Sequence, residues 1–310
     1  SQFSFEHKAI PYVDFKHQAL LPYQLSKVGP FTATADVNGD SLEDVFVGGN
    51  SQQGGVLLIQ QVNGTFKPAT SQPWQQQTVY QDMGMTFFDA DGDHDLDLFI
   101  ARGSAAFGAV PEAAQDVLFI NDGKGKFSAT VNALPNLQSN GSCVSAGDFD
   151  KDGDIDLFVG GRSLPNRYPE ADQSYLLKNE SKGNNVKFVP VQAESLASLG
   201  IVTSSVWHDI NQDGWLDLIV AGELMPITIL ENQKGKLVDK TEAYHLAKSH
   251  GMWSKILLED MDNDGDMDLI AGNAGLNSQL RANEQEPLTV TYSDFDQNET
   301  IDPMICYYIQ

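Results

Sequence analysis

The sequence predicts an all-β protein: a β-propeller of four-stranded blades, about five to seven in number and incomplete at the C-terminal end. Three observations lead to this prediction. An acidic loop of one pattern recurs six times in the 310 residues, each loop stands between two strand-like runs, and most units continue into a β-hairpin signal. Helical periodicity is weak everywhere. Four short strands in each unit of about 50 to 60 residues are typical of blades arranged around an axis.

The repeated loop begins with an aspartate and is followed at once by an apolar run. Its six copies are "DVNGDSLEDVFVGG" (36–49), "DADGDHDLDLFIAR" (89–102), "DFDKDGDIDLFVGG" (148–161), "DINQDGWLDLIVAG" (209–222), "DMDNDGDMDLIAGN" (260–273) and "DFDQNETIDPMICY" (294–307). The first aspartates lie 53, 59, 61, 51 and 34 residues apart. The last interval is too short for a whole unit.

Strand signals surround each loop. The runs before the loops are "FTATA", "MGMTFF", "SCVSAG", "TSSVWH", "SKILLE" and "TVTYS". The predicted hairpins are "LLIQQVNGTFKPA", "VLFINDGKGKFSA", "YLLKNESKGNNVKFVPV" and "TILENQKGKLVDK", with Gly or Asn at the turn, where a positive φ is needed.

We expect residues 1–310 to form a single propeller domain. Residues 1–30 would form an N-terminal segment, and the repeats would start near residues 31, 83, 141, 201, 252 and 288. Only "PMICYYIQ" follows the sixth loop, and the fifth unit has no clear hairpin. Either the N-terminal segment completes the last blade or the chain is part of a longer propeller, and we favour the second reading.

The acidic loops predict metal sites. In a nine-residue turn, side chains at positions 1, 3, 5 and 9 can point at one ion while the carbonyl at position 7 adds a backbone oxygen. These positions hold Asp36, Asn38, Asp40 and Asp44; Asp89, Asp91, Asp93 and Asp97; Asp148, Asp150, Asp152 and Asp156; Asp209, Asn211, Asp213 and Asp217; Asp260, Asp262, Asp264 and Asp268; Asp294, Asp296, Asn298 and Asp302. Every one is an oxygen donor, which favours calcium over magnesium and manganese, with about four to six ions bound.

Two other calcium motifs are excluded by spacing. An EF-hand needs Glu at position 12, where these loops have apolar strand residues, and RTX nonapeptides run in tandem. Solvated acidic turns without metal remain the alternative. A Gly at position 6 in three loops (Gly153, Gly214 and Gly265) supplies the sharp turn, whereas the first loop has Ser41 and the sixth has Glu299. Those two sites are therefore expected to be weaker.

Composition limits the classes of partner. The chain carries 43 acidic against 19 basic side chains, a formal net charge of -24, which argues against nucleic acid. No apolar run approaches the roughly 18 residues of a membrane span. The two cysteines, Cys143 and Cys306, stand in apolar strand-like runs and predict buried free thiols.

The loop followed by "DLFVGG" or "DVFVGG" resembles the FG-GAP or VCBS repeat of integrin α-subunit propellers and their bacterial relatives. That resemblance implies a loop that joins the first two strands of a blade and holds calcium. More narrowly, "DFKHQALLPYQLSKVGPFTATADVNGDSLEDVFVGG", "GRSLPNRYP", "GELMPITI" and "NAGLNSQ" are similar to large secreted VCBS-repeat proteins of the Bacteroidetes, often with an attached ASPIC/UnbV domain, which is not visible here. The resemblance covers nearly the whole chain and bears on fold and metal more than on activity.

The connections opposite the acidic loops are long and are expected to form a ligand face, because functional residues concentrate in loops on rigid scaffolds. The candidates on this face are Arg102, Arg162, Arg167, Tyr168, Trp74, Glu223, Asn277 and Arg281. For each of them an ordinary solvated side chain is the alternative interpretation.

The predicted function is a calcium-binding extracellular β-propeller that acts as a protein- or glycan-binding or adhesion module. The alternative is a carbohydrate-active enzyme resembling a polysaccharide lyase, which could recruit His208, His250 and Tyr168; no catalytic set is assigned. Loops of this kind bind calcium at about 0.1 to 1 mM, so they would fill outside the cell, in the periplasm or at the cell surface.

Overall fold

The computed structural model describes residues 5–78, 81–103, 115–137, 139–183, 185–275, 278, 280–283 and 285–308. Its main body consists of four-stranded antiparallel sheets, each built from strands that are consecutive in the sequence. We call these sheets blades 1 to 4. Blade 1 contains β1 (Thr32–Ala35), β2 (Asp44–Val47), β3 (Val56–Gln60) and β4 (Phe66–Pro68). Blade 2 contains β5 (Asp82–Phe88), β6 (Asp97–Arg102), β7 (Val117–Asn121) and β8 (Phe127–Ala129).

Blades 3 and 4 repeat the same order. Blade 3 contains β9 (Gly141–Gly147), β10 (Asp156–Gly161), β11 (Tyr175–Asn179) and β12 (Phe188–Val191). Blade 4 contains β13 (Ile201–His208), β14 (Asp217–Met225), β15 (Thr228–Asn232) and β16 (Leu237–Asp239). The far end of β14 also pairs with β17 (Gly251–Glu259), where Glu223 faces Met252 and Met225 faces Gly251.

The last two units are smaller in the described residues. Unit 5 consists of β17 and β18 (Asp268–Asn273), and unit 6 of β19 (Thr289–Ser293) and β20 (Asp302–Cys306). The described residues also contain the short 3-10 turns η1 (Asp14–Lys16), η2 (Leu25–Lys27), η3 (Pro73–Gln76) and η5 (Glu194–Leu196).

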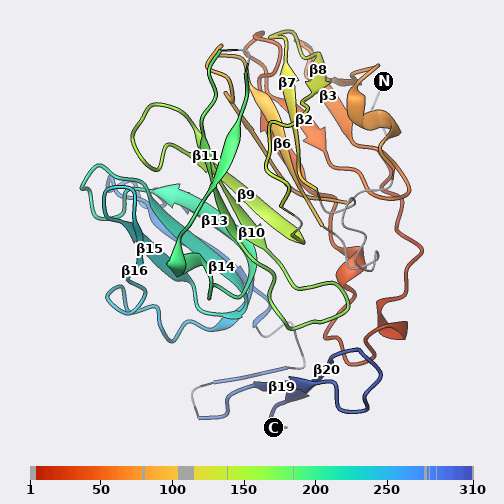
Figure 1. The fold of residues 1–310 in the computed structure, drawn as a ribbon, viewed down its shortest axis with the longest axis vertical. Coiled ribbons are helices and arrows are strands. Elements are labelled where there is room, and N and C mark those ends of the chain that lie inside the picture. Colours follow the sequence, from red (N-terminus) through yellow and green to blue (C-terminus); the bar gives the residue numbers. More distant parts are fainter. Residues whose placement is uncertain are drawn as a thin grey trace.

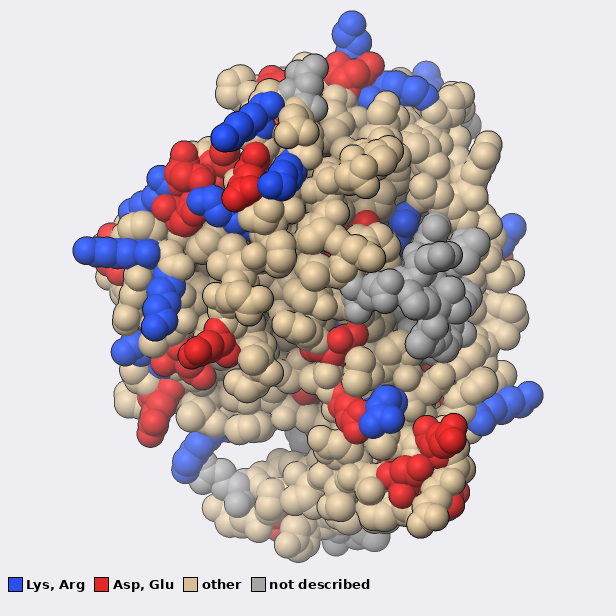
Figure 2. Space-filling model, viewed as in Figure 1, with Lys and Arg blue, Asp and Glu red and all other residues tan. Residues whose placement is uncertain are grey.

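The blades are arranged around a common centre, as Figure 1 shows. The first strands of successive units, β1, β5, β9, β13 and β17, each contact the next one. The hairpin of β19 and β20 lies at the bottom of this view, below an opening that the space-filling view in Figure 2 also shows. The all-β prediction with four-stranded, propeller-like blades is confirmed for blades 1 to 4.

The second strand of each blade explains the unbroken apolar runs after the acidic loops. Successive side chains of a strand point to opposite faces. In β6, Leu98 and Ile100 pack with blade 1, whereas Phe99 packs with blade 3. In β10, Leu157 packs with blade 2 and Phe158 packs with blade 4. Because β6 and β10 are covered on both faces by neighbouring blades, both sets of residues in these strands must be apolar.

The N-terminal segment does not extend the sixth sheet. Residues 5–30 contain η1 and η2 and no strand. The side-chain amide of Gln18 donates to the backbone carbonyls of Tyr168 (3.1 Å) and Ile301 (2.8 Å). The segment therefore links blade 3 to unit 6. The division into one domain with the six predicted starting points stays a prediction.

Both cysteines are free thiols, but only Cys143 is buried. Cys306 is exposed, so the expectation that it would be buried is wrong. It ends β20, in a sheet with only two strands, and no neighbouring blade covers it in the described part of the chain.

Candidate metal centres in the six acidic loops

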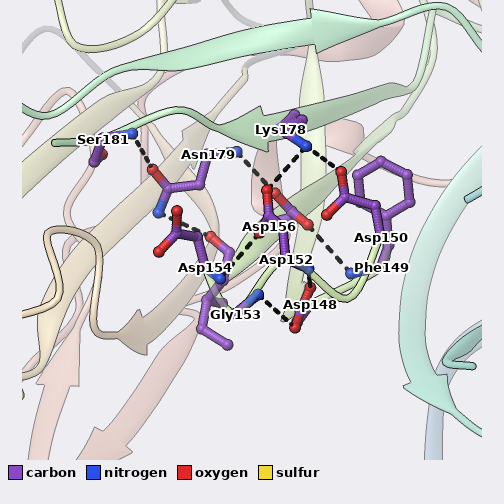
Figure 3. A network of polar contacts seen from close by, with 11 residues as sticks. Asp148, Phe149, Asp150, Asp152, Gly153, Asp154, Asp156, Lys178, Asn179 and Ser181 are labelled. Carbon is purple, nitrogen blue, oxygen red and sulfur yellow. Dashed lines mark hydrogen bonds and ion pairs between the residues drawn. The ribbon is translucent and has the colours of Figure 1, made fainter. Parts of the chain in front are cut away.

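Each acidic loop joins the first strand of its unit to the second, as the register of the pairs shows. We number the loops 1 to 6: residues 36–44, 89–97, 148–156, 209–217, 260–268 and 294–302. The aspartate at position 1 organises the turn. In loop 3, Asp148 Oδ1 accepts the Asp152 N–H (3.2 Å) and Oδ2 accepts the Gly153 N–H (3.1 Å), as drawn in Figure 3. In all six loops Oδ2 at position 1 accepts the N–H of position 6.

Two positions in every loop have a left-handed backbone. Position 4 has a positive φ at Gly39, Gly92, Lys151, Gln212, Asn263 and Gln297. Position 6 has a positive φ at Ser41, His94, Gly153, Gly214, Gly265 and Glu299. Loops 1 to 5 each place one glycine at one of these two positions, whereas loop 6 has none. In loops 1 and 2 the glycine stands at position 4, as Gly39 and Gly92, and not at position 6, where the sequence pattern predicts it.

The aspartate at position 9 is the first residue of the second strand and is completely buried in blades 1 to 4. In loop 3, Asp156 Oδ2 accepts the Phe149 N–H (3.2 Å), and Oδ1 accepts the N–H of Asn179 at the end of β11 (2.7 Å). The equivalent pairs in blades 1, 2 and 4 have the same two bonds. This carboxylate therefore ties its loop to the third strand of its own blade.

Burial changes the protonation of these carboxylates. It raises the pKa of Asp97 and of Asp156 to about 7, while the backbone N–H donors, such as those of Asn121 and Asn179, act in the opposite direction. Burial also raises the pKa of Asp44 and Asp217. A nearby cation would favour the ionised form of each group.

The asparagines that end the third strands connect successive loops. The Asn121 side-chain amide donates to the carbonyl of Val37 in loop 1 at 2.8 Å. Asn179 donates in the same way to Ala90 in loop 2 at 3.1 Å, and Asn232 to Phe149 in loop 3 at 2.7 Å. We call these three residues the bridging asparagines. The sequence interpretation missed them, although an Asn closes the third strand in "LFIN", "LLKN" and "TILEN".

The carboxylates converge as a cation site requires. In four loops one oxygen from each of positions 1, 3 and 9 lies within 4.8 Å of the others. These groups are Asp89, Asp91 and Asp97; Asp148, Asp150 and Asp156; Asp260, Asp262 and Asp268; Asp294, Asp296 and Asp302. Loops 1 and 4 have an amide oxygen donor, Asn38 or Asn211, at position 3. The donor set is all-oxygen and fits a hard divalent cation such as calcium.

Position 5 lies outside these groups. Its side chain instead accepts the N–H two residues further on, as Asp93 does from Asp95 at 2.9 Å and Asp264 from Asp266 at 3.1 Å. In loop 3, Asp150 Oδ1 is buried and has no hydrogen-bond partner, whereas Oδ2 of the same carboxylate contacts Lys178.

Loops 5 and 6 are more open than the others. Asp268 and Asp302 still accept the N–H of position 2, at 3.0 and 3.2 Å. Units 5 and 6 contain no third strand in the described residues, so position 9 lacks the second bond that it has in blades 1 to 4. Asp268 is correspondingly less buried than Asp156.

Loop 3 contains an additional cation. The Lys178 ammonium, from β11, contacts Asp150 and lies 2.9 Å from Asp152 Oδ2 (Figure 3). These two carboxylates raise the pKa of Lys178. The residue just before the third-strand terminus is Ile59 in blade 1, Ile120 in blade 2 and Glu231 in blade 4.

The ligand-face candidates have different environments. Trp74 is 2% exposed and packs at ring-centroid distances of 5.0 to 5.2 Å from Phe46, Phe119 and Phe127. Arg102 is buried with Nε 3.6 Å from Asp82. Each of these two residues lies in the interior of the described structure.

Three more candidates meet under the N-terminal segment. Arg162 lies 3.3 Å from Glu223 and donates to the Tyr23 hydroxyl at 2.8 Å. Tyr168 is 1% exposed, and its backbone N–H donates to Gln18. Arg167 is exposed and pairs with Glu170, Arg281 is exposed, and Asn277 lies outside the described residues.

Comparison with known proteins identifies the repeat. A family model described as FG-GAP-like repeat matches residues 36–100, 107–159 and 209–271, which together exceed half of the chain. No curated protein matches the sequence. None of the described helices is long and apolar enough to cross a membrane.

The solved structures that match this chain have low sequence identity to it. They include an Agrocybe aegerita lectin that recognises non-reducing terminal N-acetylglucosamine (14% identity, TM-score 0.47, 89% of this chain and 65% of the lectin). The biofilm matrix protein Bap1 of V. cholerae has 14% identity and a TM-score of 0.38, over 88% of this chain and 36% of its own. A rhamnogalacturonan lyase of Bacillus licheniformis has 11% identity and a TM-score of 0.43, over 89% and 54%. The chain spans less than two thirds of the length of each.

Proposed function

Because this chain belongs to the FG-GAP-like repeat family, we propose that it is a calcium-binding β-propeller whose ions hold the first two strands of each blade together. The observation that carries this proposal is the convergence of carboxylate oxygens within 4.8 Å of one another in four loops. Like charges this close repel, and burial of the position 9 carboxylate adds a desolvation cost. A bound divalent cation offsets both.

The residues that would hold each ion are those at positions 1, 3, 5 and 9 of its loop, with the carbonyl at position 7. Calcium, when bound, supplies charge neutralisation and a fixed crosslink rather than reactive chemistry. The carboxylate at position 1 shapes the turn by accepting backbone N–H groups of the loop. The carboxylate at position 9 attaches the loop to the third strand by accepting a backbone N–H of that strand.

The proposal extends to location and partner. Extracellular calcium modules bind at about 0.1 to 1 mM, so the sites would fill outside the cell, in the periplasm or on the cell surface. We propose that the calcium-stiffened blades present a protein- or glycan-binding face on the side of the connections between second and third strands. Among the described candidates for this face, Arg167 and Arg281 have exposed side chains and are the residues we propose for it. The narrower resemblance to Bacteroidetes proteins of the ASPIC/UnbV type stays a prediction.

The lyase alternative has no supporting observation in the described residues. A lyase needs a base and a charge-neutralising cation at one site. His208 ends β13 beside loop 4, whereas Tyr168 follows β10 at the opposite end of the strands. His250 is exposed, and Tyr168 is buried beneath the N-terminal segment.

Calcium content and thermal unfolding test the proposal. The protein is chelated, dialysed against about 1 mM calcium or magnesium, and analysed for bound metal per chain. We expect several calcium ions, and a melting temperature that rises with calcium more than with magnesium, because binding to the folded state alone stabilises it. Absence of bound metal, with the same melting temperature in chelator and in calcium, would refute the proposal.

A further inference from the structure

Lys178 distinguishes loop 3 from the other loops. Its ammonium contacts Asp150 at position 3 and Asp152 at position 5, so it lies between two of the predicted metal ligands (Figure 3). Both partners are predicted from the sequence as calcium donors, and in the structure they hold a side-chain cation. Lys178 belongs to the third strand of the same blade. The cation is therefore part of the protein chain and cannot dissociate from it as a metal ion can.

The placement of Lys178 follows from the strand register. Lys178 pairs with Val189 and stands one residue before Asn179, whose N–H holds the position 9 carboxylate. The equivalent residue in blade 2 is Ile120, which pairs with Ser128 and precedes Asn121. The position one residue before the bridging asparagine is thus equivalent in the two blades. Its side chain is aliphatic in blade 2 but cationic in blade 3.

No other cation in loop 3 neutralises these carboxylates in the same way. The loop carries five aspartates and one lysine, Lys151. The Lys151 ammonium lies 4.6 Å from the ring centroid of Trp215 in loop 4. Lys178 is therefore the cation that offsets the repulsion between Asp150 and Asp152.

We propose that Lys178 is a built-in counter-ion that replaces the divalent ion of loop 3, so that this loop is ordered without calcium while loop 2 depends on it. An ammonium about 4 Å from a divalent ion weakens binding roughly 30-fold even with water-like screening. A site with an affinity of about 0.1 to 1 mM would then stay mostly empty at about 1 mM calcium. The inference rests on the proposed function of the other loops and concerns which loop does not take an ion.

Matched variants at position 3 test this assignment in the full chain. Calcium per chain is measured after dialysis at about 1 mM for wild type, Asp91→Ala in loop 2 and Asp150→Ala in loop 3, because alanine removes the oxygen donor that an asparagine would keep. We expect Asp91→Ala to lose one ion and Asp150→Ala to keep the wild-type number. Loss of an ion in Asp150→Ala would overturn the inference and leave the proposed function intact. A wild-type chain that binds no calcium would refute the proposed function instead, and the inference with it.

Removing the ammonium supplies a second test. Lys178→Met keeps an unbranched side chain of similar length but removes the ammonium. The control is Lys187→Met, which removes a lysine outside the loop that lies 3.1 Å from Glu180. We expect Lys178→Met to bind one more calcium ion, to melt lower than wild type in chelator and to recover this loss when calcium is added. Lys187→Met should bind the wild-type number. An unchanged ion count in Lys178→Met, or a loss of stability that calcium does not restore, would assign Lys178 a packing role alone.

Discussion

The side-chain amide of Asn179 in β11 donates a hydrogen bond to the backbone carbonyl of Ala90, 3.1 Å away in the acidic loop of the preceding blade. The Ala90 N–H donates to the Asp97 carboxylate at 2.9 Å, and the Asn179 N–H donates to the Asp156 carboxylate at 2.7 Å. Loops 2 and 3 are therefore connected through three consecutive bonds, and Asn121 and Asn232 repeat the arrangement in the adjacent blades.

This connection predicts that Asn179→Ala destabilises the protein. The substitution removes the bonds from the side-chain amide to the carbonyls of Ala90 and Ile155 and leaves the buried Ala90 carbonyl without that donor. We expect the free energy of unfolding to fall by about 1 to 3 kcal/mol, measured by urea denaturation in calcium. Asn63→Ala is the control, because the Asn63 side chain bonds only within an exposed hairpin turn. Equal effects of the two substitutions would show that the bridging bond contributes nothing specific.

Loop 2 predicts the effect of removing a single ligand. Asp93→Ala takes one carboxylate from position 5, so we expect one calcium ion fewer per chain and the other loops filled as before. Asp95→Ala is the matched control, since position 7 contributes its backbone carbonyl and not its side chain. Metal analysis after dialysis decides the result. An unchanged ion count in Asp93→Ala would remove position 5 from the ligand set.

The sequence was sufficient to place the loops, the strands on either side of them and the hairpins of blades 1 to 4, because all of these depend on residues close together in the chain. The bridging asparagines depend on contacts between blades, such as Asn121 with Val37, 84 residues away. No local pattern distinguishes an Asn that ends a strand in a turn from one that also reaches the neighbouring loop.

The ligand-face candidates show the same limit. Trp74 lies within a polar stretch, "SQPWQQQ", and was expected on the surface, yet in η3 it packs against Phe46 and Phe119 in the interior. Arg162 follows β10 of blade 3 and Glu223 lies in β14 of blade 4, and both bond to Tyr23 of the N-terminal segment. That segment has no strand periodicity, so its position could not be inferred from the pattern that revealed the blades.

A pH dependence follows from Asp116, which is remote from the acidic loops. Its carboxylate accepts the Arg102 backbone N–H at 2.8 Å. Burial raises the pKa of Asp116 to about 7, against the opposing effect of Arg102. Between about pH 4 and pH 7 the folded state therefore keeps a proton that the unfolded chain has released, so the free energy of unfolding falls as pH rises through this window.

Replacement by the neutral isostere should remove this contribution. Asp116→Asn keeps an oxygen that can accept the Arg102 N–H but does not titrate. We expect its stability relative to wild type to increase by roughly 2 to 4 kcal/mol between about pH 4 and pH 7.5, measured by urea denaturation at constant ionic strength. Parallel profiles for the two proteins across this range would contradict the raised pKa.

Position 6 has a left-handed backbone in loops 3 and 6, so removing its glycine in loop 3 should be unfavourable and introducing one in loop 6 should be favourable. Gly153 has a φ of 97°, and a Cβ at this position would meet no atom within 4 Å, so the cost of Gly153→Ala comes from the backbone alone. We expect the free energy of unfolding to fall by about 1 kcal/mol in chelator, and by less for Gly153→Asn, because asparagine tolerates this region better.

In loop 6, Glu299 has a φ of 69° and no glycine stands at position 4. Glu299→Gly should therefore relieve a similar cost and raise the occupancy of loop 6 in calcium titrations. Lower occupancy in Glu299→Gly would mean that the flexibility of glycine in the unbound loop outweighs the relief of the backbone.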